Sequence, residues 1–116
     1  MRLRYGLTPY DGRLEIFHNG QWGAICDDGF TLVQANVACN QLGYGKALSS
    51  LCCSKIKANN TLGYKKLIFH GLYWLDNVVC IKAKKLSDCN HNGWGINNCG
   101  NSEAVSIECQ GKLEKK

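Results

Sequence analysis

The sequence predicts a small, disulfide-stapled domain that combines β-strands with one helix. Three observations support this class: a hairpin pattern over residues 12–26, a helical pattern over residues 31–42, and eight cysteines in a chain of 116 residues. A chain of this length corresponds to one domain. Its hydrophobic core is modest, so covalent links between distant segments would add useful stability.

Residues 12–26 have the pattern of a β-hairpin. Side chains alternate with a period of two along residues 13–18, as is typical of a strand. Asn19 and Gly20 then supply the left-handed dihedral angles that a two-residue type I′ turn requires. The return strand would place three side chains on one face: Trp22, Ala24 and Cys26.

Residues 31–42 predict a helix. The Thr31 hydroxyl can accept a hydrogen bond from a free backbone N–H at the helix start. Gly43 is a natural C-terminal stop, and Cys39 would tether the helix to the rest of the fold. Apolar side chains follow at helical spacing: Leu32, Ala35, Ala38 and Leu42.

The middle of the chain has no clear period. Residues 46–71 are expected to form a long surface loop, which includes an N-glycosylation sequon at residues 59–61. Strand patterns return at residues 67–69 and 73–79, and a final strand is expected at residues 104–109.

The cysteine spacing favours disulfides over a zinc site. The sequence contains no Cys-x-x-Cys motif, and zinc sites usually bring two ligands together at such a short spacing. Disulfides persist in oxidising compartments, so the domain is expected to be extracellular, in the secretory pathway or at the cell surface. The first residues do not resemble a signal peptide, and no apolar run is long enough to span a membrane. We therefore expect a piece of a larger secreted protein.

Six of the cysteines lie within short motifs in a fixed order. The motifs are WGAICDDG (22–29), VACNQLG (37–43), WLDNVVC (74–80), SDC (87–89), NGWGINNC (92–99) and SIEC (106–109). Together they resemble the scavenger receptor cysteine-rich (SRCR) domain, from about Arg2 to Cys109. The resemblance implies an α+β fold, in which a curved antiparallel sheet cradles one main helix and long loops connect the elements. It assigns residues 1–111 to the domain and leaves residues 112–116 as a linker or tail.

The resemblance also implies three disulfides: Cys26–Cys99, Cys39–Cys109 and Cys80–Cys89. Tyr10 and Tyr44 stand where the eight-cysteine SRCR group has an additional bridge, so the chain is similar to the six-cysteine group.

Cys52 and Cys53 have no counterpart in the six-cysteine group. Three states remain open for them: a disulfide between the two neighbours, free thiols, or links to another chain or to another part of the parent protein.

A calcium site is the main chemical expectation. In cation-binding SRCR domains, two acids at the positions of Asp27 and Asp28 join a glutamate, which corresponds to Glu103. A second site of the family corresponds to Asp76 and Asn98. Carboxylate oxygens are hard ligands of the kind that Ca²⁺ prefers. The family motif SEDAG reads SEAVS over residues 102–106, and the lost aspartate predicts a weak affinity.

Lysines are concentrated in the middle third of a chain whose net charge is +5. They form either a solvated surface or a patch that binds anionic ligands by long-range attraction. The proposed ligand patch contains Lys55, Lys57, Lys65, Lys66, Lys82, Lys84 and Lys85.

The resemblance implies a binding or adhesion module, with Ca²⁺ assisting recognition of anionic glycans, lipids or partner proteins. The alternative is a structural interaction domain that packs against neighbouring domains of the parent protein and binds no free ligand. Catalysis is not expected, because the paired acids of a glycosidase face each other across a cleft, whereas Asp27 and Asp28 are adjacent. No specific nucleic-acid binding is expected.

Overall fold

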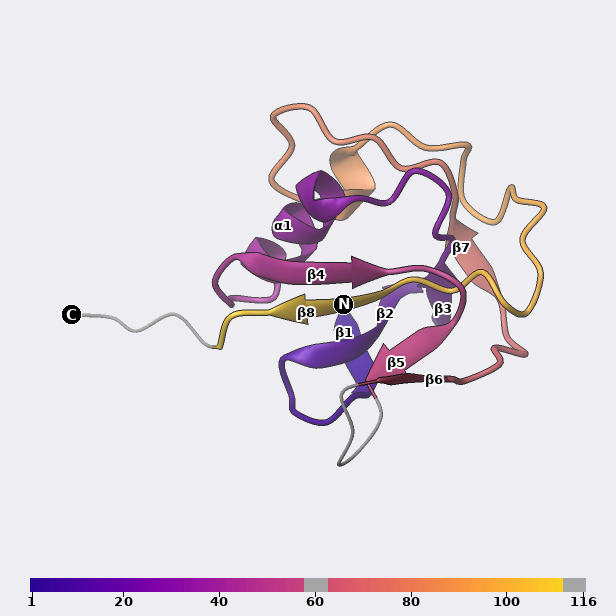
Figure 1. Cartoon of the computed structure of the whole chain (residues 1–116). Coiled ribbons are helices and arrows are strands. Elements are labelled where there is room, and N and C mark those ends of the chain that lie inside the picture. Colours follow the sequence, from indigo (N-terminus) through magenta and orange to yellow (C-terminus); the bar gives the residue numbers. More distant parts are fainter. Residues whose placement is uncertain (58–62, 112–116) are drawn as a thin grey trace.

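One α-helix packs against a curved six-stranded sheet (Figure 1). The computed structural model describes residues 1–57 and 63–111. The strand order is β4-β8-β2-β3-β7, and β1 pairs with β2 beside this path. A separate hairpin consists of β5 and β6. The bounds are β1 Arg2–Tyr5, β2 Asp11–His18, β3 Gln21–Ile25, α1 Leu32–Gln41, β4 Ala47–Leu51, β5 Lys55–Lys57, β6 Tyr64–Lys66, β7 Tyr73–Leu75, the 3₁₀ helix η1 Leu86–Asp88, and β8 Ser106–Cys109.

The predicted hairpin is formed by β2 and β3. Asn19 and Gly20 have φ angles of 51° and 79°, as the turn requires. The polar side chains of β2 at Asp11, Arg13 and Glu15 are nevertheless buried, and β1 pairs with that strand. Glu15 accepts a hydrogen bond from Arg2 Nε at 2.7 Å and another from Arg13 Nε at 3.0 Å. These ion pairs compensate for the burial of the Glu15 carboxylate.

The predicted helix is also present, with a different buried face. Thr31 Oγ1 accepts a hydrogen bond from the backbone N–H of Val33, and Gly43 follows the helix with φ 85°. Leu32, expected on the core side, is 48% exposed, whereas Gln34 is buried. Gln34 Nε2 donates to the carbonyl oxygen of Gly29, and its Oε1 accepts from the backbone N–H of Cys80. The amide thereby ties the helix to two loops.

The expectation of a long loop over residues 46–71 is wrong for most of its described part. β4 pairs with β8, and β5 pairs with β6. β4 is half-buried along most of its length and β5 has only three residues, so neither shows the alternation that reveals a strand. Residues 67–69, expected as a strand, have no strand pairing. The sequon at residues 59–61 lies outside the described residues.

The sheet is mixed, although the resemblance implied an antiparallel one. β3 and β7 run parallel, whereas every other pair of strands is antiparallel among the described residues. A parallel pair requires a long crossover, and here the crossover contains α1 and β4 to β6. The carboxyl ends of β3 and β7 therefore meet at the same edge.

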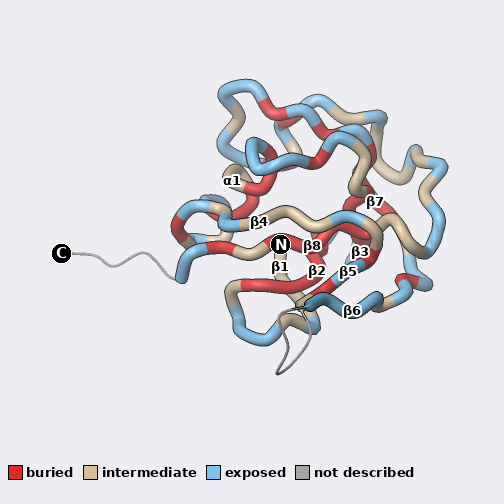
Figure 2. The backbone as a smooth tube through the Cα atoms, viewed as in Figure 1, coloured by how far each residue is buried: buried red, intermediate tan, exposed pale blue. Residues whose placement is uncertain are grey.

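The core lies between the sheet and α1 (Figure 2). Disulfides join Cys26 to Cys99, Cys39 to Cys109 and Cys80 to Cys89, which are the pairs that the resemblance implies. A fourth disulfide joins the neighbours Cys52 and Cys53. Within the described residues, no helix is long and apolar enough to cross a membrane. The fully buried side chains of the core include Leu14, Ile25, Leu75, Val78, Leu86, Val105 and Ile107.

Candidate functional site

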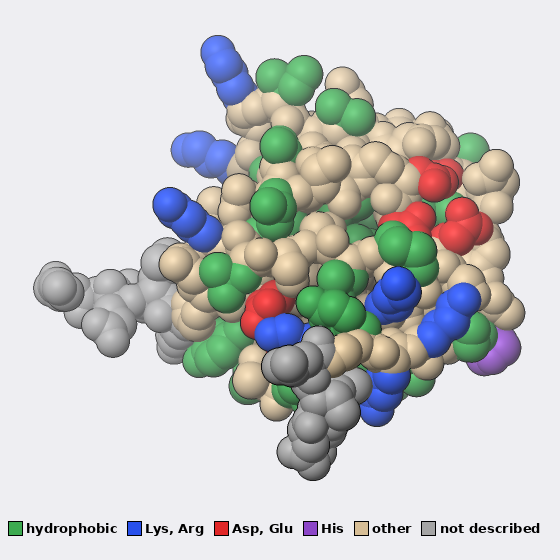
Figure 3. All heavy atoms as spheres, viewed as in Figure 1, with side chains coloured by type: hydrophobic (Ala, Val, Ile, Leu, Met, Phe, Trp, Pro, Cys, Tyr) green, Lys and Arg blue, Asp and Glu red, His purple; other side chains and the backbone are tan. Residues whose placement is uncertain are grey.

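Acidic side chains converge where the carboxyl ends of β3 and β7 meet. Asp27 and Asp28 follow β3 after Cys26, and Asp76 directly follows β7. The third contribution comes from Glu103, which precedes the bridge between Ala104 and Cys26. Figure 3 shows acidic side chains gathered on this part of the surface. Three chain segments that are remote in sequence thus bring their carboxylates to one edge of the sheet.

The Cys26–Cys99 disulfide lies among these acids. Carboxylate oxygens of Asp28 and Glu103 and the Sγ atom of Cys99 all lie within 4.8 Å of one another. A carboxylate oxygen of Asp76 and the two sulfur atoms of the disulfide form a second group within the same distance. The covalent link therefore holds the loop after β3 against the loop that carries Glu103.

Asp27 is fixed by two backbone groups. Its N–H donates to the carbonyl oxygen of Glu103 at 2.8 Å, and its Oδ2 accepts from the N–H of Cys53 at 2.7 Å. Burial raises the pKa of the Asp27 carboxyl, and the charges of Asp28 and Glu103 raise it further, although the Cys53 hydrogen bond lowers it. The acids therefore repel one another when all are ionised.

Asp76 is the most buried of the acids, with only 1% of its surface exposed. Its Oδ2 accepts a long hydrogen bond of 3.4 Å from Asn92 Nδ2. Its Oδ1 has no hydrogen-bond partner among the described residues. Burial raises the pKa of the Asp76 carboxyl, and the nearby charge of Asp28 adds to the shift. A buried carboxylate with a free oxygen is costly unless a cation compensates for it.

Glu103 and Asn98 complete the predicted set. Glu103 Oε2 accepts a hydrogen bond from the N–H of Gly100. Asn98 is exposed and directly precedes Cys99, which brings its backbone beside the cluster. Ala104, which replaces the family's aspartate, is fully buried against the end of β3. The structure thus gathers Asp27, Asp28, Asp76 and Glu103, and places Asn98 at the margin.

The donor set fits a hard divalent cation. Ca²⁺ accepts several oxygen ligands, including carboxylates and backbone carbonyls, in a flexible geometry. The cluster offers carboxylates from three loops, and the unpartnered Oδ1 of Asp76 is one oxygen with no other role. Burial is the main cause of the raised pKa values of Asp27 and Asp76, and a cation here would offset both the burial of these charges and the smaller repulsion from Asp28 and Glu103.

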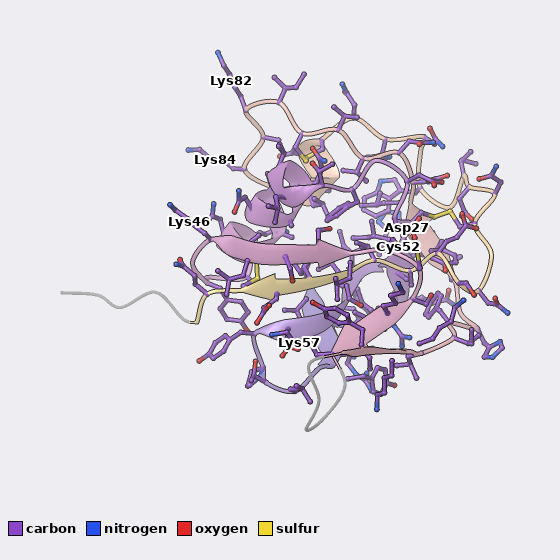
Figure 4. All side chains as sticks on the ribbon, viewed as in Figure 1. Asp27, Lys46, Cys52, Lys57, Lys82 and Lys84 are labelled. Carbon is purple, nitrogen blue, oxygen red and sulfur yellow. A yellow bond between two sulfur atoms is a disulfide. The ribbon has the colours of Figure 1, made fainter. Side chains whose placement is uncertain are left out.

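The proposed lysine patch is divided into two groups. Four lysines lie on the β5–β6 hairpin, where Lys55 is directly opposite Lys66. Lys82 and Lys84 project from the loop before η1, far from Lys57 (Figure 4), and Lys85 follows them in the chain. Lys57 is paired with Glu108. The seven lysines therefore do not form one surface.

Sequence reasoning missed the backbone groups that position the acids. The N–H groups of Cys53 and Gly100 hold Asp27 and Glu103, and Asn92 holds Asp76. The contact between Cys53 and Asp27 joins residues 26 positions apart, so no local pattern reports it. The two extra cysteines were the one visible signal that this turn is unusual.

Comparisons with known proteins identify the family of this domain. The family model of the scavenger receptor cysteine-rich domain, a non-catalytic interaction module of larger extracellular proteins, matches residues 4–110. A scavenger receptor cysteine-rich domain superfamily protein of Patiria pectinifera is 43% identical over 94% of this chain and 9% of its own length. Lysyl oxidase homolog 4 of Bos taurus is 42% identical over 94% of this chain and 14% of its own length. The chain thus spans only a small part of these relatives.

Two solved structures have the same fold. The third SRCR domain of murine neurotrypsin has a TM-score of 0.74 and 39% identity, covering 97% of this chain and 96% of that one. The SRCR domain of mouse MARCO, in its dimeric form, has a TM-score of 0.70 and 33% identity, covering 95% and 94%. The chain belongs to the scavenger receptor cysteine-rich domain family.

Proposed function

We propose that this domain is an extracellular binding module of a larger protein, in which Ca²⁺ held by the acidic cluster assists recognition of anionic ligands. The observation that carries the proposal is the buried Asp76 Oδ1, which is unpartnered among the described residues. A carboxylate oxygen of Asp76 lies within 4.8 Å of Cys99 Sγ, as do carboxylate oxygens of Asp28 and Glu103, and the charges of Asp28 and Glu103 also act on Asp27. The cation would be held by Asp27, Asp28, Glu103 and Asp76, with Asn98 at the edge.

The cation would act as a bridge between the domain and its ligand. The cluster lies on loops at the edge of the sheet, and Asp27, Asp28 and Glu103 are each partly exposed. With one oxygen from each of the four carboxylates, a Ca²⁺ ion that takes about 6–8 oxygen ligands keeps open positions, which carboxylate or sulfate groups of a ligand can fill. Because the loops are already held by a disulfide and backbone hydrogen bonds, little ordering is needed when the ion binds.

The β5–β6 lysines would extend this surface. Figure 3 shows basic side chains over β5 and β6 on the same face as the acidic cluster. Lys55 and Lys66 lie directly opposite each other, an arrangement of like charges that is unfavourable without an anion. An anionic glycan, lipid or protein that contacts a bound Ca²⁺ can therefore also contact Lys55 and Lys66, which share one face of the hairpin. A ligand at this surface would not also contact the second lysine group, which consists of Lys82, Lys84 and Lys85.

Calcium titration of the folded protein tests the first step. Calorimetry should detect saturable binding with a dissociation constant of about 10⁻⁴–10⁻³ M, the range typical of extracellular modules. Asp28→Ala should abolish the binding. Asp88→Ala, which removes an exposed acid in η1, should leave it unchanged. Absence of binding far above about 10⁻³ M would refute the calcium site.

Retention on an immobilised sulfated glycan tests the second step. Binding that requires Ca²⁺ and is lost when a chelator is added supports bridging. Retention that ignores the chelator would mean that lysines alone attract the polymer, and it would refute calcium assistance.

A structural role within the parent protein is the second candidate. Several large apolar side chains are exposed, among them Ile81 at 74%, Ile96 at 62% and Val33 at 58%. Exposed apolar side chains of this kind can pack against a neighbouring domain. If neither Ca²⁺ nor a polyanion binds, this candidate accounts for the domain better than ligand recognition does.

A further inference from the structure

The Cys52–Cys53 disulfide lies against the acidic cluster. Figure 4 shows Cys52 beside Asp27. The two sulfur atoms and a carboxylate oxygen of Asp27 lie within 4.8 Å of one another. The N–H of Cys53 is also the donor that holds Asp27 Oδ2, at 2.7 Å. The same turn therefore carries a disulfide and positions a candidate cation ligand.

The turn also contacts the loop that carries Glu103. The N–H of Ser54 donates to the carbonyl oxygen of Ala104 at 3.0 Å, and Ser54 Oγ accepts from the N–H of Ala104 at 3.1 Å. Ser54 Oγ in turn donates to the carbonyl oxygen of Asn101. A change in the turn can therefore reach both Asp27 and Glu103.

The backbone of this turn has an unusual conformation. Cys53 and Ser54 have φ angles of 72° and 56°, in the left-handed region that residues with a Cβ atom rarely adopt. Two consecutive residues of this kind persist only where their surroundings impose the conformation. The disulfide between adjacent residues closes a small ring around the intervening peptide and is one such constraint. Without it, the turn has more freedom to relax.

Accessibility and topology distinguish this disulfide from the other three. Cys52 is exposed, whereas each of the other bridges contains a buried cysteine: Cys26, Cys39, and both Cys80 and Cys89. The other bridges join residues 73, 70 and 9 positions apart. Each of them closes a chain loop and so stabilises the fold by restricting the unfolded chain. The Cys52–Cys53 bridge joins adjacent residues and closes no such chain loop. Breaking it removes little of the constraint on the unfolded chain.

We propose that Cys52–Cys53 is a thiol-reactive redox site whose reduction weakens cation binding at the neighbouring acids. The coupling to the cation rests on the proposed function, whereas the reactivity of the disulfide does not. The reactant is a dithiol, either a small molecule or the active-site pair of a protein. One of its thiolates attacks the exposed Cys52 Sγ, the S–S bond breaks, and the Cys53 sulfur leaves as a thiolate that takes up a proton. The second thiolate of the reactant then displaces Cys52, which becomes a thiol, and the reactant is released as a disulfide.

Reduction acts on the cation site through Asp27. The ring that constrains Cys53 opens, and its N–H is no longer held toward Asp27 Oδ2. Groups that orient metal ligands typically affect metal affinity by about 10- to 100-fold when they are lost. Because only one of the carboxylates is affected directly, we expect Ca²⁺ binding to weaken by about tenfold, the lower end of that range.

Selective reduction tests the redox site. The folded protein is treated with limiting dithiothreitol, quenched with N-ethylmaleimide and mapped by mass spectrometry. Cys52 and Cys53 should be labelled together before any of the other six cysteines. Labelling of another pair first, or of all four pairs at the same rate, would overturn the proposal.

Calcium titration of the oxidised and selectively reduced forms tests the coupling. The reduced form should bind about tenfold more weakly. The double variant Cys52→Ser/Cys53→Ser should match the reduced form and should not respond to the reductant, which controls for damage to other disulfides. Equal affinity in the two redox forms would overturn the coupling. If the oxidised form binds no Ca²⁺, both the coupling and the calcium function fail, while the labelling experiment still decides whether the thiol-reactive site exists.

Discussion

The rings of Tyr10 and Tyr44 meet edge to face, with their centroids 5.0 Å apart and their planes at 84°. By the resemblance to the eight-cysteine SRCR group, these two positions correspond to the cysteines of its additional disulfide. The N–H of Cys109 donates to the carbonyl oxygen of Tyr10, and the N–H of Tyr44 donates to that of Cys39. The aromatic pair therefore lies beside the Cys39–Cys109 bridge and occupies the place of a further covalent link.

Replacing both tyrosines should restore that link. Tyr10→Cys/Tyr44→Cys is expected to form a disulfide and to raise the free energy of unfolding by about 1.5–3.5 kcal/mol. Closing the loop contributes about 3–4 kcal/mol through the unfolded chain, and loss of the aromatic contact costs about 0.5–1.5 kcal/mol. Denaturant unfolding measures the difference. Tyr10→Ala/Tyr44→Ala, which loses the contact and adds no bridge, should be less stable than the wild type. Two free thiols in the folded cysteine variant would contradict the expectation.

In the calcium-free domain, Asp76→Asn should remove a pH-dependent loss of folding stability. Because the pKa of Asp76 is raised in the fold, the folded state holds its proton more tightly than the unfolded state, whose ordinary value is 3.8. Stability should therefore fall as pH rises from that value through the raised pKa, and the full penalty should persist above it. Asp76→Asn should flatten part of this fall and stabilise the domain by about 1 kcal/mol at neutral pH in a chelator, the scale of one unsatisfied buried group.

Added Ca²⁺ should reverse the ranking of these two proteins. The wild type gains stability from an ion that binds only the folded state, and Asp76→Asn gains less. Thermal unfolding in chelator and in Ca²⁺ measures both effects, and Asp88→Asn serves as the exposed-acid control. A stability difference between the wild type and Asp76→Asn that does not grow as pH rises above 3.8 in chelator would refute the role assigned to Asp76.

Gln34→Met should destabilise the domain by about 1–3 kcal/mol. Methionine keeps the approximate shape of the side chain but leaves the N–H of Cys80 and the carbonyl oxygen of Gly29 without their partner. Denaturant unfolding measures the loss. Asn40→Met, at an exposed position of the same helix, is the matched control and should change stability little. Equal stability of the two variants would show that Gln34 does not fix these loops.

The two lysine groups should differ in their contribution to polyanion binding. Lys55→Glu/Lys65→Glu/Lys66→Glu should elute from a heparin column at a lower salt concentration than Lys82→Glu/Lys84→Glu/Lys85→Glu in the presence of Ca²⁺. Both variants change the net charge equally, so a difference reports the location of the lysines rather than general attraction. Identical elution would mean that neither group forms a specific surface.

Local signals in the sequence were sufficient for the hairpin and the helix. Asn19 and Gly20 specify their turn by their own backbone preferences, and Thr31 caps α1 through a hydrogen bond to a residue two positions away. Short or half-buried strands were not predictable, because β4, β5 and β6 depend on partners elsewhere in the chain. The burial of Gln34 was likewise hidden, since its partners Gly29 and Cys80 lie on separate loops.

The acids of the candidate site were named through family resemblance and not through any local pattern. What brings them together is the parallel pairing of β3 and β7, which a sequence without an alignment does not reveal. The same limit applies to the turn at Cys53, whose effect on Asp27 exists only in the folded chain.

The two long-range disulfides also determine how the domain would respond to a mechanical pull on its ends. Tension applied before β1 and after β8 would pass from Cys26 directly to Cys99 and reach Cys109 ten residues later. The chain between Cys39 and Cys99, which includes β4 and Asp76, would be shielded from the load. A neighbouring domain that strains this module could peel away β1 and β2, but it could not extend the segment between Cys39 and Cys99 while both disulfides are intact.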